Sequence, residues 1–167
     1  MSVLVTITER KPIALLVVGV ALMVLGVYFM TRPNRNIRNR NPLNIEKGAD
    51  WVGLQSFQND SRFAQFRAAK YGFRAGYIIL LQYLERGNNT IEKIISIWAP
   101  SVENHTGNYI ETIANKLNIS EFQEIEPRDL AELMLAMSDY EGGNGHFTLA
   151  QATSGIELAN QESFVIA

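Results

Sequence analysis

The sequence lacks several residues and motifs that would point to particular chemistries. None of its 167 residues is a cysteine, which excludes disulfide bonds, thiolate metal sites and cysteine nucleophiles. The two histidines, His105 and His146, stand far apart and outside any cluster with ligand spacing, so we expect no metal site and no cofactor. A glycine-rich phosphate loop and a Ser–His triad pattern are also missing. We expect no specific recognition of nucleic acid.

One long apolar run does stand out, because residues 12–30 contain no charged or strongly polar side chain. As a helix this run would be about 28 Å long at ~1.5 Å per residue, close to the ~30 Å hydrocarbon core of a bilayer. A secretory signal peptide is the alternative, but its apolar region is shorter and precedes small residues at a cleavage site. Here Tyr28 and Phe29 close the run, which favours an uncleaved transmembrane helix.

Charge is distributed unevenly, although the net charge of the whole chain is only −2. Residues 32–74 carry nine Lys and Arg against three Asp and Glu, whereas residues 75–167 carry four against thirteen. A basic segment beside an apolar run indicates contact with anionic lipid or another polyanion, and a solvated stalk is the alternative. The positive-inside rule, applied to the arginines after the run, places the rest of the chain on the cytoplasmic side.

Beyond the basic segment the sequence predicts one mainly α domain with a small β region. Turn residues and scattered aromatics between Trp51 and Phe66 predict short irregular strands. Asn89 with Glu92 predicts a capping box at the start of one helix. Apolar periodicity and capping residues predict helices over about 68–86, 89–98, from 106 onward, 127–141 and 148–160. The segments are then a tail (1–11), a transmembrane helix (12–30), a basic linker (31–37) and a domain (38–167).

The first candidate for chemistry is Glu141, at the end of a predicted helix and before Gly142 and Gly143. The negative end of the helix dipole disfavours an ionised carboxylate there, and an apolar wall would disfavour it further. Both effects favour a protonated carboxyl group near neutral pH, which a general acid for glycosidic cleavage requires. The alternative is an ordinary exposed glutamate before a glycine C-cap.

Two further segments carry clustered polar side chains. Glu103, Asn104, Thr106 and Tyr109 fall in one loop and helix start, where they can hydrogen-bond a polar polymer, and Glu103 can supply a second carboxylate. The alternative is a helix-entry loop whose side chains cap the backbone. The segment 38–51 has three asparagines within six residues around a proline, which excludes a helix interior and predicts a polar turn.

The order of these pieces resembles a family of bacteriophage virion proteins that look like lysozyme-superfamily peptidoglycan hydrolases or lytic transglycosylases. The resemblance covers about residues 37–160 and continues to the helix that ends at Glu141. The matching positions are Arg38, Asn39, Asn41, Pro42, Asn44, Ile45, Trp51, Gly53, Phe63, Phe66, Gly72, Arg74, Ala75, Ile94, Ile95, Trp98, Ala99, Pro100, Glu103, Asn104, Thr106 and Tyr109.

The resemblance implies a lysozyme-like fold, possibly in circularly permuted order, in which Glu141 lies beside the Asn41–Asn44 turn. It implies that Glu141 is the acid and that Glu103 is the next candidate. The implied substrate-binding residues are Asn41, Asn44, Asn104, Thr106 and Tyr109. Two positions depart from the family: Leu43 stands where glycine is usual and Arg40 where asparagine is frequent. A bulky Leu43 would disfavour a left-handed backbone and narrow a sugar cleft.

By this resemblance the chain is a membrane-anchored virion protein that cleaves the glycan backbone of peptidoglycan during host entry, as a lytic transglycosylase or a muramidase. The alternative is a non-catalytic structural membrane protein of the virion with a degenerate lysozyme-like domain. The expected partners are peptidoglycan, a lipid bilayer contacted through residues 12–30 and other virion proteins. The expected location is the virion membrane or a capsid-associated membrane, and the host inner membrane during assembly.

Overall fold

The computed structural model describes residue 18, residues 33–100 and residues 106–165, with side chains described through residue 161. Contacts within the chain divide it into two units, Met1–Pro33 and Asn34–Ala167. All helices named below belong to the second unit. This unit begins at Asn34, so part of the segment 31–37, predicted as a basic linker, belongs to the folded domain.

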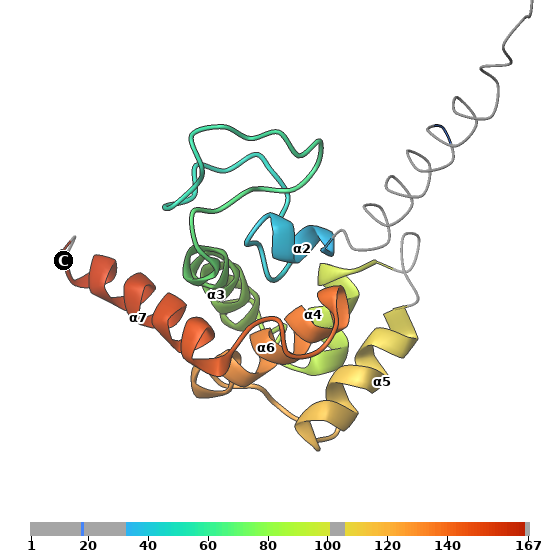
Figure 1. Cartoon of the computed structure of the whole chain (residues 1–167). Coiled ribbons are helices and arrows are strands. Elements are labelled where there is room, and N and C mark those ends of the chain that lie inside the picture. The colour runs from blue at the N-terminus through green and yellow to red at the C-terminus, as the bar shows by residue number, and fades with distance from the viewer. Residues whose placement is uncertain (1–17, 19–32, 101–105, 166–167) are drawn as a thin grey trace, which may run out of the picture. The chain divides into compact units, whose positions relative to one another are not determined.

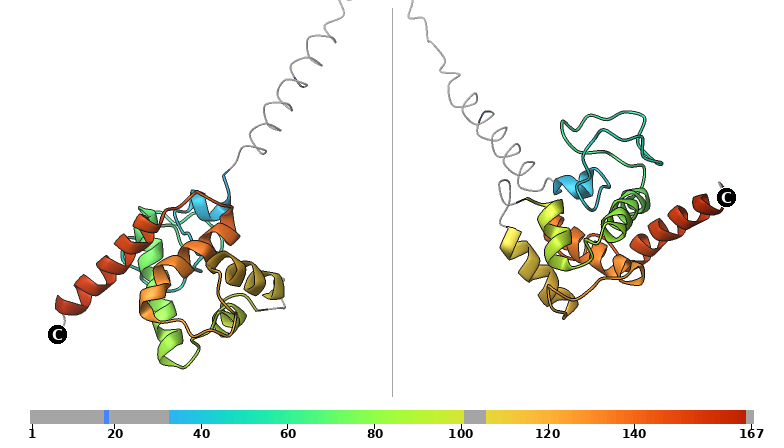
Figure 2. Two further views of the ribbon diagram at one scale, coloured as in Figure 1. Left: turned by 90° about the horizontal axis from the view of Figure 1, so that it is seen from below. Right: turned by 180° about the vertical axis from the view of Figure 1, so that it is seen from behind.

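The second unit is mainly helical, and its helices pack around one apolar core (Figures 1 and 2). The bounds of α3 to α7 agree with the helical ranges expected from the sequence to within a few residues. The last helix runs further than expected. The elements are α2 (Arg35–Arg38), α3 (Ala69–Glu85), α4 (Ile91–Trp98), α5 (Thr106–Leu117), the 3-10 helix η1 (Pro127–Asp129), α6 (Leu130–Gly142) and α7 (Leu149–Val165).

Side-chain caps explain where two of these helices begin. The hydroxyl of Thr90 accepts a hydrogen bond from the backbone N–H of Lys93 at 3.3 Å and caps α4. The predicted cap at Asn89 is therefore wrong by one residue. At the start of α7, Thr148 and Gln151 each accept a hydrogen bond from the other's backbone N–H, which confirms the predicted start.

Helices α3 and α7 pack side by side, as the views in Figures 1 and 2 agree. The contact depends on Gly155 of α7, because a Cβ atom there would lie 2.7 Å from both the backbone N of Arg74 and the backbone O of Lys70. Only a residue without a side chain permits this approach. The fully buried core beside these helices includes Phe73, Leu80, Ile94, Ile113, Leu133 and Met134.

The predicted fold class needs correction, because it included a transmembrane helix. Among the residues that the structure describes, no helix is both long and apolar enough to cross a membrane. The longest helices there, α3 and α7, have 17 residues each and mix polar with apolar side chains, as helices that pack on a domain core do. The run 12–30, for which a membrane span and bilayer contact were predicted, lies outside the described residues except for Val18.

Residues 46–66 form an irregular loop in place of the predicted short strands. Backbone pairing there is limited to two isolated antiparallel bridges, Glu46 with Phe63 and Leu54 with Phe66. Glutamine side chains supply further hydrogen bonds to the backbone of this loop. The Gln58 amide donates to the Gln65 carbonyl at 2.7 Å, and the Gln58 side-chain oxygen accepts from the Gln65 backbone N–H. Side-chain bonds of this kind compete with a regular strand ladder.

Asp60 in this loop ties the loop to α2. Its carboxylate is almost fully buried and accepts two hydrogen bonds from the Arg35 guanidinium, at 2.6 and 2.7 Å. Arg38 and the Asn39 amide also contact it, at 3.4 and 2.8 Å. The hydrogen bond from Arg35 is the main cause that holds the pKa of Asp60 far below its usual range. These arginines, predicted to contact an external polyanion, therefore pair within the domain.

We predict that Asp60→Asn lowers the free energy of unfolding by about 2 kcal/mol, because it leaves buried donors poorly paired while solvent screens the partly exposed Arg35. A depressed carboxyl pKa contributes stability above pH ~4, and this contribution is lost as the pH falls. As the pH drops below about 4, the stability of the variant should therefore fall less than the stability of the wild type. Denaturant unfolding at several pH values measures both effects.

Glu46→Gln is the matched control for this change. Glu46 also pairs with an arginine, Arg62, but its side chain is 59% exposed, so its loss should change stability by no more than about 0.5 kcal/mol. Equal effects of the two substitutions would contradict the central role of Asp60.

Candidate functional site

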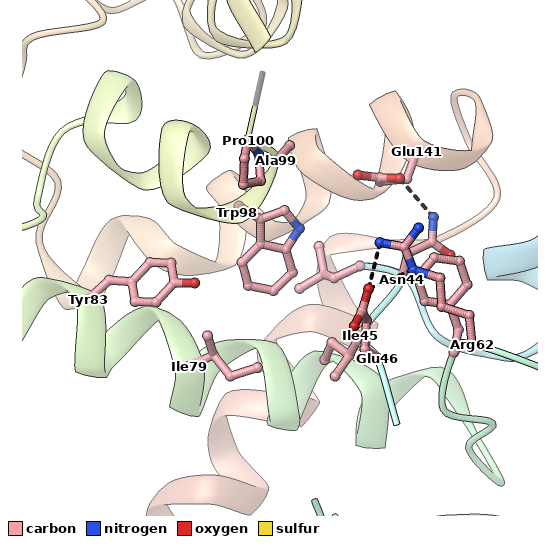
Figure 3. A pocket seen from close by; sticks show the side chains of 12 residues that line it. Asn44, Ile45, Glu46, Arg62, Ile79, Tyr83, Trp98, Ala99, Pro100 and Glu141 are labelled. Atoms are coloured by element: carbon pink, nitrogen blue, oxygen red, sulfur yellow. Dashed lines mark hydrogen bonds and ion pairs between the residues drawn. The ribbon is translucent and has the colours of Figure 1, made fainter. Parts of the chain in front are cut away.

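A cleft of about 540 Å³ opens on the domain surface, and its two sides differ in character (Figure 3). Its volume falls within the range of small-molecule sites. One side carries apolar and aromatic groups, Ile79, Tyr83 and Trp98, with the last two rings in an edge-to-face contact at 6.4 Å. The other side carries Asn44, Glu46, Arg62 and Glu141.

Glu141 and Asn44 meet in this cleft. Glu141 lies in the last turn of α6, and the Asn44 amide donates a hydrogen bond to its Oε2 at 2.7 Å (Figure 3). Asn44 has a positive φ of 49°, a left-handed conformation that asparagine tolerates better than most residues. The prediction that Glu141 lies beside the Asn41–Asn44 turn is confirmed.

Asn34 and Asn36, upstream of this turn, also bind the backbone near the end of α6. The Asn34 amide donates to the Gly142 carbonyl at 2.5 Å, and the buried Asn36 amide donates to the carbonyls of Ser138 and Pro42, both at 3.3 Å. Carbonyls in the last turn of a helix lack partners within the helix. The Asn34 amide therefore satisfies the carbonyl at the end of α6, and the Asn36 amide adds a second bond one turn earlier, at Ser138.

The environment of Glu141 raises the pKa of its carboxyl group. Burial is the main cause, since it disfavours the charged form, while hydrogen bonding from Asn44 and Tyr109 lowers the pKa in part. The net shift is upward, which agrees with the direction expected from the sequence. A carboxyl group of this kind stays protonated to higher pH than an ordinary glutamate and can act as a general acid.

Tyr109 lies next to this carboxyl group. It is 1% exposed, and burial, followed by the charge of Glu141, raises the pKa of its hydroxyl well above its usual range. The hydroxyl is near enough to Glu141 to lower the pKa of that carboxyl group, but it has no hydrogen-bond partner among the described residues. Tyr109 therefore keeps its proton at neutral pH and can donate it in a hydrogen bond.

A second carboxylate in the cleft is Glu46. Its Oε1 lies 2.6 Å from both Nε and Nη2 of Arg62, so the two side chains form an ion pair at the rim (Figure 3). Glu103, predicted as the second carboxylate, lies outside the described residues, as does Asn104.

Asn41 and Thr106, which were predicted to bind substrate, do not line the open cleft. Asn41 is fully buried, and its amide bonds the backbone of Ile45 and Ala64. The Thr106 hydroxyl donates to the Ala99 carbonyl at 2.7 Å at the start of α5. Leu43 is fully buried at the base of the cleft, and the left-handed residues of this segment are Arg40 and Asn44. Substrate contacts by Asn41 and Thr106 stay predictions, although the structure gives both a role within the fold.

Sequence reasoning missed Asn34 and Asn36, because both were assigned to the linker. The only available signal was the density of asparagines, which continues upstream of Asn39. The aromatic wall was also missed, since Tyr83 and Trp98 belong to different helices and the sequence does not show that they meet. Among the described residues, no group of three or more His, Asp or Glu is arranged to hold a metal ion.

The structure thus defines a small helical domain with one partly buried acid in an open, polar-rimmed cleft. No family model matches the sequence. The chain is 39% identical over 142 residues to Protein P5 of Pseudoalteromonas phage PM2, an alignment that covers 80% of this chain and 89% of that protein. The chain belongs to the family of this phage protein, and the predicted phage origin is confirmed at that level.

We predict that Gly142→Ala destabilises the protein by about 1–3 kcal/mol, because inserted methyl groups strain a packed site. A Cβ atom at Gly142 would lie 2.3 Å from atoms of the Asn36 amide. Gly107→Ala is the matched control: Gly107 lies in α5, where an added Cβ meets no atom within 4 Å, and alanine there should stabilise by up to about 1 kcal/mol. Thermal unfolding compares them. A neutral Gly142→Ala would show that Asn36 does not support the end of α6.

Proposed function

We propose that this phage protein is a component of the phage particle that cleaves the glycan backbone of peptidoglycan, with Glu141 as the general acid. The observation that carries the proposal is the partly buried Glu141 at an open cleft, held by the Asn44 amide at 2.7 Å. The aromatic wall formed by Trp98 and Tyr83 suits a sugar ring, because aromatic faces and edges contact the apolar C–H groups of sugars while polar rim groups bond the hydroxyls. The likeness to lysozyme-type proteins supports the same reaction.

In this mechanism the Glu141 carboxyl group gives its proton to the bridging glycosidic oxygen as the bond from that oxygen to the sugar C1 breaks. The resulting oxocarbenium-like centre is captured by water or by the 6-hydroxyl of the same sugar, and the attacking hydroxyl returns a proton to Glu141. Asn44 stabilises the carboxylate between these steps. Asn44, which lines the cleft, and Asn104, outside the described residues, would orient the sugar.

The intramolecular route, which gives a 1,6-anhydro end, is the favoured outcome. Hydrolysis requires a second carboxylate to activate water or stabilise the centre, whereas the intramolecular route can proceed with one. Within the described part of the cleft, the second carboxylate, Glu46, is paired with Arg62. This pairing occupies an oxygen of Glu46, which supports lytic transglycosylation over hydrolysis.

We predict that Glu141→Gln reduces glycan cleavage by the full chain at least about 100-fold, since general acid catalysis contributes roughly 10²–10⁴-fold. Turbidity clearance of purified peptidoglycan, with mass spectrometry of the released fragments, measures both rate and product. Glu132→Gln is the matched control, because Glu132 is an exposed glutamate on the same helix α6. It should keep full activity.

Other outcomes of this experiment separate the alternatives. Activity that survives Glu141→Gln would move the acid elsewhere, with Glu103 the next residue to substitute. Fragments with reducing ends in place of 1,6-anhydro ends would indicate hydrolysis. A folded wild-type protein without activity would reject the enzymatic proposal.

We also predict a pH dependence that follows from the raised pKa of Glu141. Cleavage should fall as the pH rises through this pKa, above the value near 4.3 of an ordinary glutamate, because the acid then loses its proton. Asn44→Ala removes a hydrogen bond that favours the ionised form, so it should move this alkaline limb to higher pH. The pH–rate profiles of the two proteins test this, and a limb that moves to lower pH would contradict the assigned role of Asn44.

A second candidate function is a non-catalytic structural role in the phage particle. The exposed side chains of Val52 and Phe57 favour it, since Phe57 is 76% exposed on a loop fixed by the Gln58 and Gln65 hydrogen bonds. Exposed aromatic groups on ordered loops are typical of protein contacts. Binding to other particle proteins is compatible with either function.

A further inference from the structure

Tyr140 is the exposed member of an aromatic pair that reaches the candidate acid. It precedes Glu141 in α6, and its ring stacks on the ring of Tyr109 from α5, with centroids 3.8 Å apart and planes 11° apart. Tyr140 is 38% exposed, whereas Tyr109 is 1% exposed. Tyr140, which has no assigned contact with a substrate, therefore covers one face of the Tyr109 ring.

The Tyr109 hydroxyl occupies an unusual position for a buried polar group. It is buried without a hydrogen-bond partner among the described residues, yet it is near enough to the Glu141 carboxyl group to lower the pKa of that group. A buried hydroxyl without a partner is unfavourable, and most such groups in proteins are paired. This hydroxyl is therefore free to donate a hydrogen bond to the Glu141 carboxylate when that group is ionised.

Helices α5 and α6 are joined at a second point near the same turn. The Lys116 ammonium contacts the Asp139 carboxylate at 2.5 Å and the Asn144 side-chain oxygen at 2.9 Å. Asp139 of this ion pair lies two residues before Glu141 in α6, and Tyr140 of the stacked pair directly precedes Glu141. The ion pair fixes the distance between the helices, and the stack fixes the plane of the Tyr109 ring.

We propose that Tyr140 is a positioning residue: its ring holds the Tyr109 hydroxyl where that hydroxyl donates a hydrogen bond to the Glu141 carboxylate once Glu141 has lost its proton. The significance of this for catalysis rests on the proposed function, in which Glu141 becomes a carboxylate after protonating the leaving oxygen. Tyr109 keeps its own proton throughout, so no further proton transfer is needed.

The charged and titratable groups around Glu141 determine whether a change in its titration can be assigned to the position of Tyr109. The neutral Asn44 amide of the facing turn bonds the carboxyl group, and Tyr109 of α5 influences its pKa. Asp139 on the same helix is paired with Lys116 of α5, and Glu46 at the cleft rim is paired with Arg62. Substituting a neutral Tyr140 changes none of these charges, so a change in Glu141 titration would report geometry.

The test is a titration of the Glu141 carboxyl carbon by ¹³C NMR in the full chain, with Glu141→Gln identifying the signal. Tyr109→Phe should raise the pKa of Glu141 by roughly half a unit or more, because it removes a donor to the ionised form. Tyr140→Leu should raise it in the same direction, whereas Tyr140→Phe, which keeps the stacked ring, should not. In Tyr109→Phe combined with Tyr140→Leu the two shifts should not add, since both act through one hydroxyl.

Two results would overturn the proposal: a Glu141 titration that Tyr140→Leu leaves unchanged, or shifts that add in the double variant. Tyr140→Met is a second stack-breaking variant if Tyr140→Leu unfolds, and circular dichroism verifies folding of each. The titration does not require cleavage of any glycan. If the wild type cleaves nothing but the coupled shifts appear, the proposed function fails and the positioning role stands. If cleavage depends on Glu141 but the shifts are absent, only the positioning role fails.

Discussion

The buried carboxylate of Asp60 is the interaction on which the arrangement of the site depends. It binds Arg35, Arg38 and Asn39, and so it fixes α2 against the irregular loop 46–66. Once α2 is in place, the asparagines of the same segment reach the end of α6 and support the turn that carries Glu141. A carboxylate with this many donors stays ionised at any physiological pH, which makes it a durable anchor.

The domain places its two important carboxyl groups in opposite environments. Asp60 is surrounded by cationic and amide donors, and its pKa lies far below the usual range. Glu141 has burial as its main influence and only neutral donors, so its pKa lies above the usual range. The first group is suited to holding structure and the second to giving up a proton. This difference follows from the neighbours of each residue, because the two side chains have nearly the same intrinsic acidity.

Several features were predictable because they depend on residues close together in sequence. The ranges of α3 to α7 follow apolar periodicity and local caps, and the Glu141 helix ends where glycines follow it. Strands over residues 51–66 were wrong, because Gln58 and Gln65 bond the backbone with their side chains. The folded unit also begins before the predicted domain start at residue 38, at Asn34, and Arg35 within it pairs with Asp60 of the loop.

The sequence alone determined that the chain folds into a helical domain, that sulfur chemistry is excluded and that Glu141 stands at a helix end near glycines, since composition and local periodicity carry this information. The resemblance of the sequence to phage proteins predicted that Glu141 lies beside the Asn41–Asn44 turn. Only the tertiary structure decided which asparagines are structural, that Glu46 is paired with Arg62, and that Tyr140 covers Tyr109. The Glu46–Arg62 pair joins residues 16 positions apart, and the bonds from Asn34 and Asn36 to the end of α6 join residues more than 100 positions apart. Burial and partner choice at such separations arise from packing of the whole domain, which no local pattern encodes.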